Sequence, residues 1–164
     1  MKKLFFIIFL CMTQIVNAQT TKKETTNKNI VKTTNPKAPA DFKKTLLPGD
    51  SVYNFKGTVM IKNGHGEKVK VFFNGSVDKN KWEELKKSKN YSDYDAFNLV
   101  ASILSVNAQY KLKNTQSFSP LSDQFFMWSN DTNSFISNYK MMGRNGFGNL
   151  TESTALVEYN PFND

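Results

Sequence analysis

The sequence has few of the residues that carry most catalytic and metal chemistry: its 164 residues include one cysteine, one histidine and one arginine. Cys11 lies in an apolar N-terminal stretch, so a chain that loses this stretch has no thiol and no disulfide. Small exported domains often depend on disulfides, so here the hydrophobic core must supply the stability. One imidazole without cysteine partners is a poor zinc ligand set. We therefore expect no metal and no cofactor.

Residues 1–18 have the pattern of a cleavable signal peptide. Two lysines precede the apolar stretch Leu4–Met12, and small residues lead up to Ala18. The stretch is shorter than the roughly 20 apolar residues of a transmembrane helix, so we expect no membrane anchor. Cleavage before Gln19 predicts a secreted or periplasmic protein. Lipid attachment at Cys11 is a weaker alternative, because large residues precede that cysteine.

Residues 19–45 are predicted to form a disordered tether. They are rich in Thr, Lys, Asn and Pro and have no hydrophobic period. Seven lysines against two acids give the segment a net charge of +5, whereas residues 46–164, with 13 basic and 12 acidic side chains, have +1. Nucleic-acid readers concentrate basic groups on the folded module, so we expect no nucleic-acid partner. The tether is suited at most to weak association with an anionic surface.

Residues 46–164 are predicted to form one globular domain. Alternating apolar residues over 52–62 and 68–74, around Gly64-His65-Gly66, indicate a β-hairpin. Both apolar sets occupy odd positions, and facing residues share a face of the sheet. The loop should therefore have three residues, with Gly66 in the left-handed conformation.

Two helices should follow the hairpin. Asp78 is the expected N-cap of a short helix that ends near Lys87, with Trp82 and Leu85 on its buried side. Ser92 opens a second helix with a capping box. Its apolar stripe comprises Phe97, Val100, Ala101, Leu104 and Ala108. No charge occurs from 96 to 110, so we expect most of this helix to be covered.

Strands are expected at 135–142 and at 151–159. We interpret 124–129 as a buried strand, with a helical turn as the alternative. The order ββααβββ predicts an α+β domain: an antiparallel sheet of about five strands with two helices packed on one face. In outline the arrangement resembles the helix-on-curved-sheet shape of cystatin-like folds, without any sequence motif of that family.

Two groups of residues are candidate sites. The loop 143–149 offers the single arginine and an aromatic side chain between glycines, and our binding hypothesis names Arg144, Asn145, Phe147 and Asn149. The second helix carries an uncharged polar stripe, and we expect it under a loop, at a subunit contact or along a pocket: Asn98, Ser102, Ser105 and Gln109.

Catalytic residues are not indicated. His65 is expected at an exposed hairpin tip without an orienting carboxylate, and most acids have local explanations as helix caps or solvated charges. The favoured function is a non-enzymatic binding domain for a protein or glycan outside the cytoplasm, of open oligomeric state. The alternatives are a small carboxylate-based hydrolase and a cystatin-like ligand-pocket protein.

The signal peptide makes a direct prediction. Intact-mass spectrometry of the native protein should find Gln19 as the first residue, because Ala18 closes the cleavage pattern. Recovery of the chain from inside the cell with Met1 still attached would contradict export.

Overall fold

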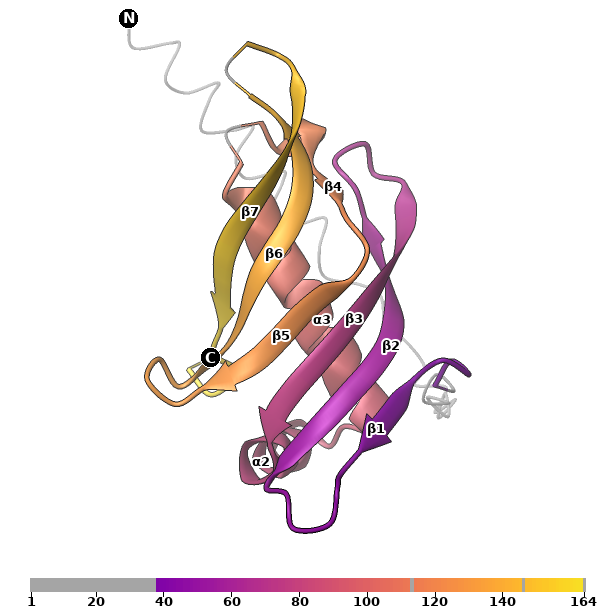
Figure 1. Ribbon diagram of the computed structural model, residues 1–164, viewed down its shortest axis with the longest axis vertical. Helices are drawn as coiled ribbons and strands as arrows, with labels where there is room; N and C mark the ends of the chain where they lie inside the picture. The colour runs from indigo at the N-terminus through magenta and orange to yellow at the C-terminus, as the bar shows by residue number, and fades with distance from the viewer. Residues whose placement is uncertain (1–37, 113, 146, 164) are drawn as a thin grey trace, which may run out of the picture. The chain divides into compact units, whose positions relative to one another are not determined.

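The computed structural model (Figure 1) describes residues 38–163 except 113 and 146, so the predictions for residues 1–37 lie outside the described residues. The domain is α+β, as expected. Its elements in chain order are β1 (Lys43–Thr45), β2 (Val52–Lys62), β3 (Lys68–Asp78), α2 (Lys79–Lys89), α3 (Asp93–Tyr110), the 3₁₀ turn η1 (Thr115–Ser117), β4 (Ser119–Pro120), β5 (Gln124–Ser129), β6 (Ser134–Arg144) and β7 (Leu150–Tyr159).

The β2–β3 hairpin is confirmed, including its three-residue loop. Asn63 N–H donates to the Glu67 carbonyl at 2.9 Å and closes the loop. Gly66 has φ +80°, a backbone conformation that glycine adopts without strain. Gly64 is needed for another reason: its N–H donates to the Phe118 carbonyl, and a Cβ there would collide with the backbone of this neighbouring segment.

The sheet has seven strands, where about five were expected, and it is not wholly antiparallel. β1, β2 and β3 form one antiparallel group; β4, β5 and β7 all pair with β6 in a second one. The groups are joined by β3 and β5, which run parallel over four residue pairs. The expected all-antiparallel order is wrong here because the two helices carry the chain from β3 back to the beginning of β5, as parallel neighbours require.

The folded part begins earlier than expected. Residues 43–45 were assigned to the tether, but they form β1 and pair with Asn54–Lys56 of β2. Phe42 packs against the rings of Tyr94 and Phe97, with centroids 5.4 and 5.2 Å apart. One aromatic residue among lysines and prolines gives no periodic signal, so this part of the tether was predicted wrongly.

Both helices begin where the sequence indicated. Asp78 accepts hydrogen bonds from the N–H groups of Asn80 and Lys81 at the start of α2. Ser92 and Asp95 form the complete capping box of α3. Trp82, Leu85 and the predicted apolar stripe of α3 are all buried. Capping and periodicity are local signals, and here they set the helix boundaries correctly.

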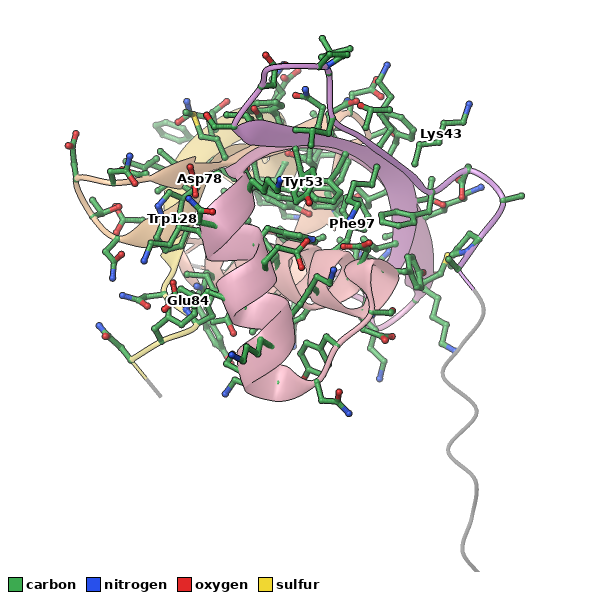
Figure 2. The ribbon with its side chains drawn as sticks, turned by 90° about the horizontal axis from the view of Figure 1, so that it is seen from below. Lys43, Tyr53, Asp78, Glu84, Phe97 and Trp128 are labelled. Carbon is green, nitrogen blue, oxygen red and sulfur yellow. The ribbon has the colours of Figure 1, made fainter. Side chains whose placement is uncertain are left out.

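The sheet curves around α3, which contacts β2, β6 and β7. Figure 1 shows α3 crossing behind the strands, while α2 lies at the ends of β2 and β3. Both helices were expected to pack on one face of the sheet. α3 does so, whereas α2 contacts β2 and β3 and covers one end of the layer (Figure 1). Figure 2 shows Tyr53 and Phe97 under the arch of the sheet.

Gln124 joins two strands that share one edge of β6. β4 pairs with the end of β6 and β5 with its beginning, which leaves Lys140 between them. The buried side-chain amide of Gln124 accepts from Lys140 N–H at 2.8 Å and donates to the Lys140 carbonyl at 2.7 Å. The Gln124 side chain thus provides partners for Lys140 between β4 and β5, together with Leu121 N–H, which donates to the Lys140 carbonyl at 3.2 Å.

Aromatic side chains supply much of the core that a disulfide-free domain needs. Phe126 on β5 packs near Phe73, Phe97 and Phe135, with ring centroids 5.8–6.4 Å apart. Gly75 is opposite Phe126 in the parallel pair, and the ring covers the space where a side chain would be. Buried aromatics on three strands and a helix therefore meet at the junction between the two sheet groups.

Gly75→Ala should destabilise the domain by about 1–3 kcal/mol, the usual cost of overpacking a core. Its added Cβ would lie 2.7 Å from Phe126 Cε2, and this clash outweighs the roughly 0.5–1 kcal/mol that replacing a strand glycine normally gains. Urea unfolding measures the difference. Ser76→Ala, on the outer face, is the control and should change stability by less than about 0.5 kcal/mol. Equal stability of the two variants would contradict this packing.

Candidate functional site

The strand edge of β2 is only half covered. Because Asn63 pairs with Glu67, the odd-numbered residues of β2 direct their backbone N–H and C=O groups toward β3, and the even-numbered residues direct theirs to the opposite edge. Asn54 and Lys56 meet β1 there. Thr58, Met60 and Lys62 lie past Lys43, the first residue of β1, and no strand of the described chain pairs with their outward backbone groups.

A hollow of about 400 Å³ lies beside this uncovered edge. We call it the β2 edge groove, and its lining comes from Met60, Ile61 and Lys62 of β2 and from Ser102, Ser105, Val106, Gln109 and Tyr110 of α3. Met60 and Tyr110 are 56% and 76% exposed. An unpaired strand edge, a partly apolar wall and a single charge on the lining make this the best-formed candidate site in the described chain.

Three of the four polar stripe residues predicted on α3 line this groove, and Asn98 does not. Ser105 is buried: its hydroxyl donates to the Ala101 carbonyl at 2.7 Å and accepts from Tyr139 at 3.0 Å. Burial, partly offset by that bond to Ser105, raises the pKa of Tyr139, which therefore keeps its proton as the donor. Ser105 thus anchors α3 to β6, and Ser102 and Gln109 are left as the polar groups of the groove wall.

The sequence did not single out Met60, Lys62 or Tyr110. Met60 gave one overlooked signal: it is an apolar residue at an even position of β2, where its neighbours Lys56 and Lys62 are charged. An exposed apolar residue on a polar face marks a surface that something can cover. The length of the free edge depends on the residue at which β1 begins, and no local pattern of β2 indicates that residue.

The loop 143–149 is organised by its own polar side chains. Asn145 Oδ1 accepts from the N–H groups of Phe147 and Asn149, each at 3.0 Å. Arg144 Nη1 donates to the Gly148 carbonyl at 2.7 Å. Phe147 projects with 93% of its surface exposed. Of the four residues in the binding hypothesis, Arg144, Asn145 and Asn149 take part in holding the loop, and Phe147 is the one presented to solvent.

A second free edge, on β7, is partly occupied by α3. Asn107 Nδ2 donates to the Glu158 carbonyl at 2.6 Å, at the end of that strand. An open polar hollow of about 560 Å³ lies beside it, lined by Asn107, Tyr110, Lys111, Leu156 and Glu158. Because α3 already bonds to this edge and covers its C-terminal end, it is a less complete strand-pairing site than the edge of β2.

The outer face of the sheet also departs from expectation. β5 was interpreted as buried, but only its even-numbered residues face the core; Phe125 and Met127 are 49% and 44% exposed. They border a shallow hollow of about 270 Å³ with Ile136 and Leu156. The continuous run Phe125–Trp128 made the two faces of this strand indistinguishable in the sequence.

Asp93 is the centre of the main ionic cluster. It accepts from Lys44 at 2.7 Å, from Lys86 at 3.0 Å and from Trp82 Nε1 at 2.9 Å. Burial alone raises the pKa of Asp93, but these donors outweigh it and hold the pKa below its usual value. For Lys86, burial alone lowers the pKa. The hydrogen bonds that Lys86 donates to Asp93 and Glu83 outweigh burial, and the pKa of Lys86 is raised above its usual value.

This cluster has a structural role. A general base near neutral pH needs a carboxylate with a raised pKa, and a nucleophilic lysine needs a lowered one. The shifts of Asp93 and Lys86 have the opposite directions and fix both charges. The bonds tie β1, α2 and the first turn of α3 together.

Other candidate groups are engaged or isolated. Asp78 and Asp95 cap helices, and Asp41 accepts from the Thr58 hydroxyl at 2.6 Å. His65 is exposed at the hairpin tip, as predicted. Within the described residues, no group of three or more His, Cys, Asp and Glu side chains is arranged to hold a metal ion.

No protein-family model matches the chain, and neither a curated protein nor a solved structure was found to match it. Among the described residues, no helix has the length and apolar character needed to cross a bilayer.

Asp93→Asn should lower the stability at pH 7 by about 1–2 kcal/mol, because two charged hydrogen bonds are weakened. The pKa of Asp93 is depressed in the folded state. Its contribution is therefore complete above the unfolded pKa of about 3.9 and disappears as the pH falls through the folded pKa. Urea unfolding at several pH values should show a gap to wild type that holds at pH 7 and 5 and narrows below about pH 4.

Glu84→Gln is the matched control, since Glu84 is exposed and pairs only with Lys81. Exposed pairs contribute little, so it should behave as wild type throughout. An Asp93→Asn gap that stays constant down to pH 2 would show that the loss is one of packing and not of charge.

Proposed function

We propose that the protein is a non-enzymatic binding module that works outside the cytoplasm and captures an extended polypeptide segment at the β2 edge groove. One observation carries the proposal: within residues 38–163, as far as the structure describes them, no strand pairs with the outward backbone groups of Thr58, Met60 and Lys62, which lie beside a hollow of about 400 Å³. This is the geometry that strand addition uses. The edge supplies main-chain hydrogen bonds, and the adjoining hollow accepts alternate side chains.

The chemistry of the groove suits a peptide better than a glycan or a small metabolite. An incoming strand would continue the sheet, with one set of side chains over α3 and the other on the outer face beside Met60. Ser102 and Gln109 offer polar contacts on the α3 side, and Val106 and Tyr110 offer apolar ones.

Export supports the same function through location. The N-terminal 18 residues have the signal-peptide pattern, and the segment that follows them is rich in lysine. An interaction module of the cell envelope or the extracellular space is consistent with both. Phe147, held on an ordered loop, is a second contact point for the same partner or for another one.

The two alternative functions have less support. A carboxylate-based hydrolase needs acids free to transfer protons, whereas Asp93, Asp78 and Asp95 are engaged in ion pairs and caps. A ligand-pocket protein needs space between helix and sheet. That space holds Phe97, Phe126 and Tyr139, each of them fully buried.

Two variants of Met60 test strand addition. Met60→Pro removes the outward N–H of the edge and costs no bond to β3, whereas Met60→Ala keeps the N–H and removes only the side chain. Fluorescence anisotropy with ten-residue peptides that alternate β-branched and polar residues should show at least a tenfold loss for Met60→Pro and less than about threefold for Met60→Ala, since one hydrogen bond contributes about 1 kcal/mol and the proline also blocks the approach of the strand.

The same peptides with N-methylated backbones provide a control that does not depend on the folding of a variant. They should bind wild-type protein at least tenfold more weakly, because N-methylation removes the donors that an added strand uses. Equal binding of methylated and unmethylated peptides, or equal binding by the two Met60 variants, would refute strand addition.

A further inference from the structure

Three lysines gather on the outer face of the β2–β3 hairpin, and one of them, Lys62, lines the β2 edge groove. Lys62 and Lys68 are directly opposite each other in the β2–β3 register, and Lys70 is opposite Met60. All three lysines are exposed. Like charges in facing positions of an antiparallel pair are destabilising, so this end of the hairpin tolerates a repulsion that a negative partner would relieve.

The carboxylates of the described chain do little to neutralise these lysines. Lys70 Nζ is 3.8 Å from Asp41 Oδ2, an exposed pair whose carboxylate also accepts from Thr58. Glu67 accepts from the Asn63 side chain at 2.8 Å. Neither Lys62 nor Lys68 has an ion pair among the described residues, and the groove lining contains no acidic side chain.

We infer that the segment captured at the β2 edge groove is acidic, with carboxylates at alternate positions of an extended chain. This inference rests on the proposed strand addition. Alternate residues of an added strand share a face, so one set of carboxylates would lie beside Lys62 and its neighbours on the outer face. The other set of side chains would lie over Val106 and Tyr110 of α3, where apolar or hydroxyl-bearing residues fit.

Charge also argues against two other occupants. Residues 19–37 of this chain hold five lysines and one glutamate, so the protein's own N-terminal segment would add to the repulsion. A second copy that paired through the same edge would bring its own Lys62 into the cluster. Lysine on a free edge is a common means of preventing such self-pairing.

Three peptides of one length test the charge requirement against the purified full-length protein. They alternate valine with glutamate, glutamine or lysine, and anisotropy is read at 0.05 and 0.5 M NaCl. At low salt the glutamate peptide should bind about tenfold more tightly than the glutamine peptide, and the lysine peptide should bind most weakly. The preference should shrink several-fold at high salt, because exposed charges are screened.

Variants of the protein locate the effect. Lys62→Gln combined with Lys68→Gln should reduce the glutamate preference, taken as the ratio of the two peptide affinities for the same protein, to less than about twofold. Lys89→Gln, at the end of α2, is the matched control and should keep the full preference. Thermal unfolding should show an unchanged midpoint for Lys89→Gln and a midpoint no lower than that of wild type for the double variant, which removes the repulsion between two facing lysines.

The outcomes separate this inference from the function on which it rests. If glutamate and glutamine peptides bind equally and Met60→Pro abolishes both, strand addition holds and the acidic partner is wrong. If no peptide binds, or if N-methylation of the peptides leaves their binding unchanged, the proposed function fails as well. If light scattering shows self-association that Met60→Pro abolishes, the occupant is a second copy and the inference is overturned.

Discussion

The close contact between Gly75 and Phe126 joins the two halves of the molecule. Each half is an antiparallel group that local hairpins and turns assemble. Among the strands that the structure describes, only the parallel pair β3–β5 joins the two groups. A side chain on Gly75 would keep β5 away from β3, because the Phe126 ring already occupies that space. This junction determines how the sheet curves, where α3 packs and where the two free edges lie.

Sequence patterns predicted the elements that are determined locally. The alternation over 52–74 gave the hairpin and its loop length, and the capping residues Asp78 and Ser92 gave the helix starts. β1, β4 and the parallel pairing were missed. β1 and β4 have three and two residues, too few to show a hydrophobic period. The side-by-side arrangement of β3 and β5 depends on how α2 and α3, which follow β3 in the chain, pack against the sheet.

The candidate site was predicted in part for the same reason. An uncharged stripe on α3 was visible in a lysine-rich chain, and three of its four residues line the groove. The other wall depends on where β1 begins, and β1 is preceded by a turn in which Phe42 N–H donates to the Pro39 carbonyl. The binding hypothesis for the loop 143–149 stays a prediction; the Arg144 guanidinium donates to the Gly148 carbonyl, a contact that the sequence did not indicate.

The amide of Gln124 has a consequence for how the strands find their alignment. Alternating hydrophobicity repeats every two residues, so a β-strand that slides by two positions still presents the same faces. Gln124 breaks this degeneracy, because its carbonyl and amino groups match the N–H and C=O of Lys140 while β4 and β5 hold their own partners on either side. In any other alignment the buried Gln124 amide would lose its hydrogen-bond partners. One polar side chain thereby fixes the register of β6 relative to β4 and β5.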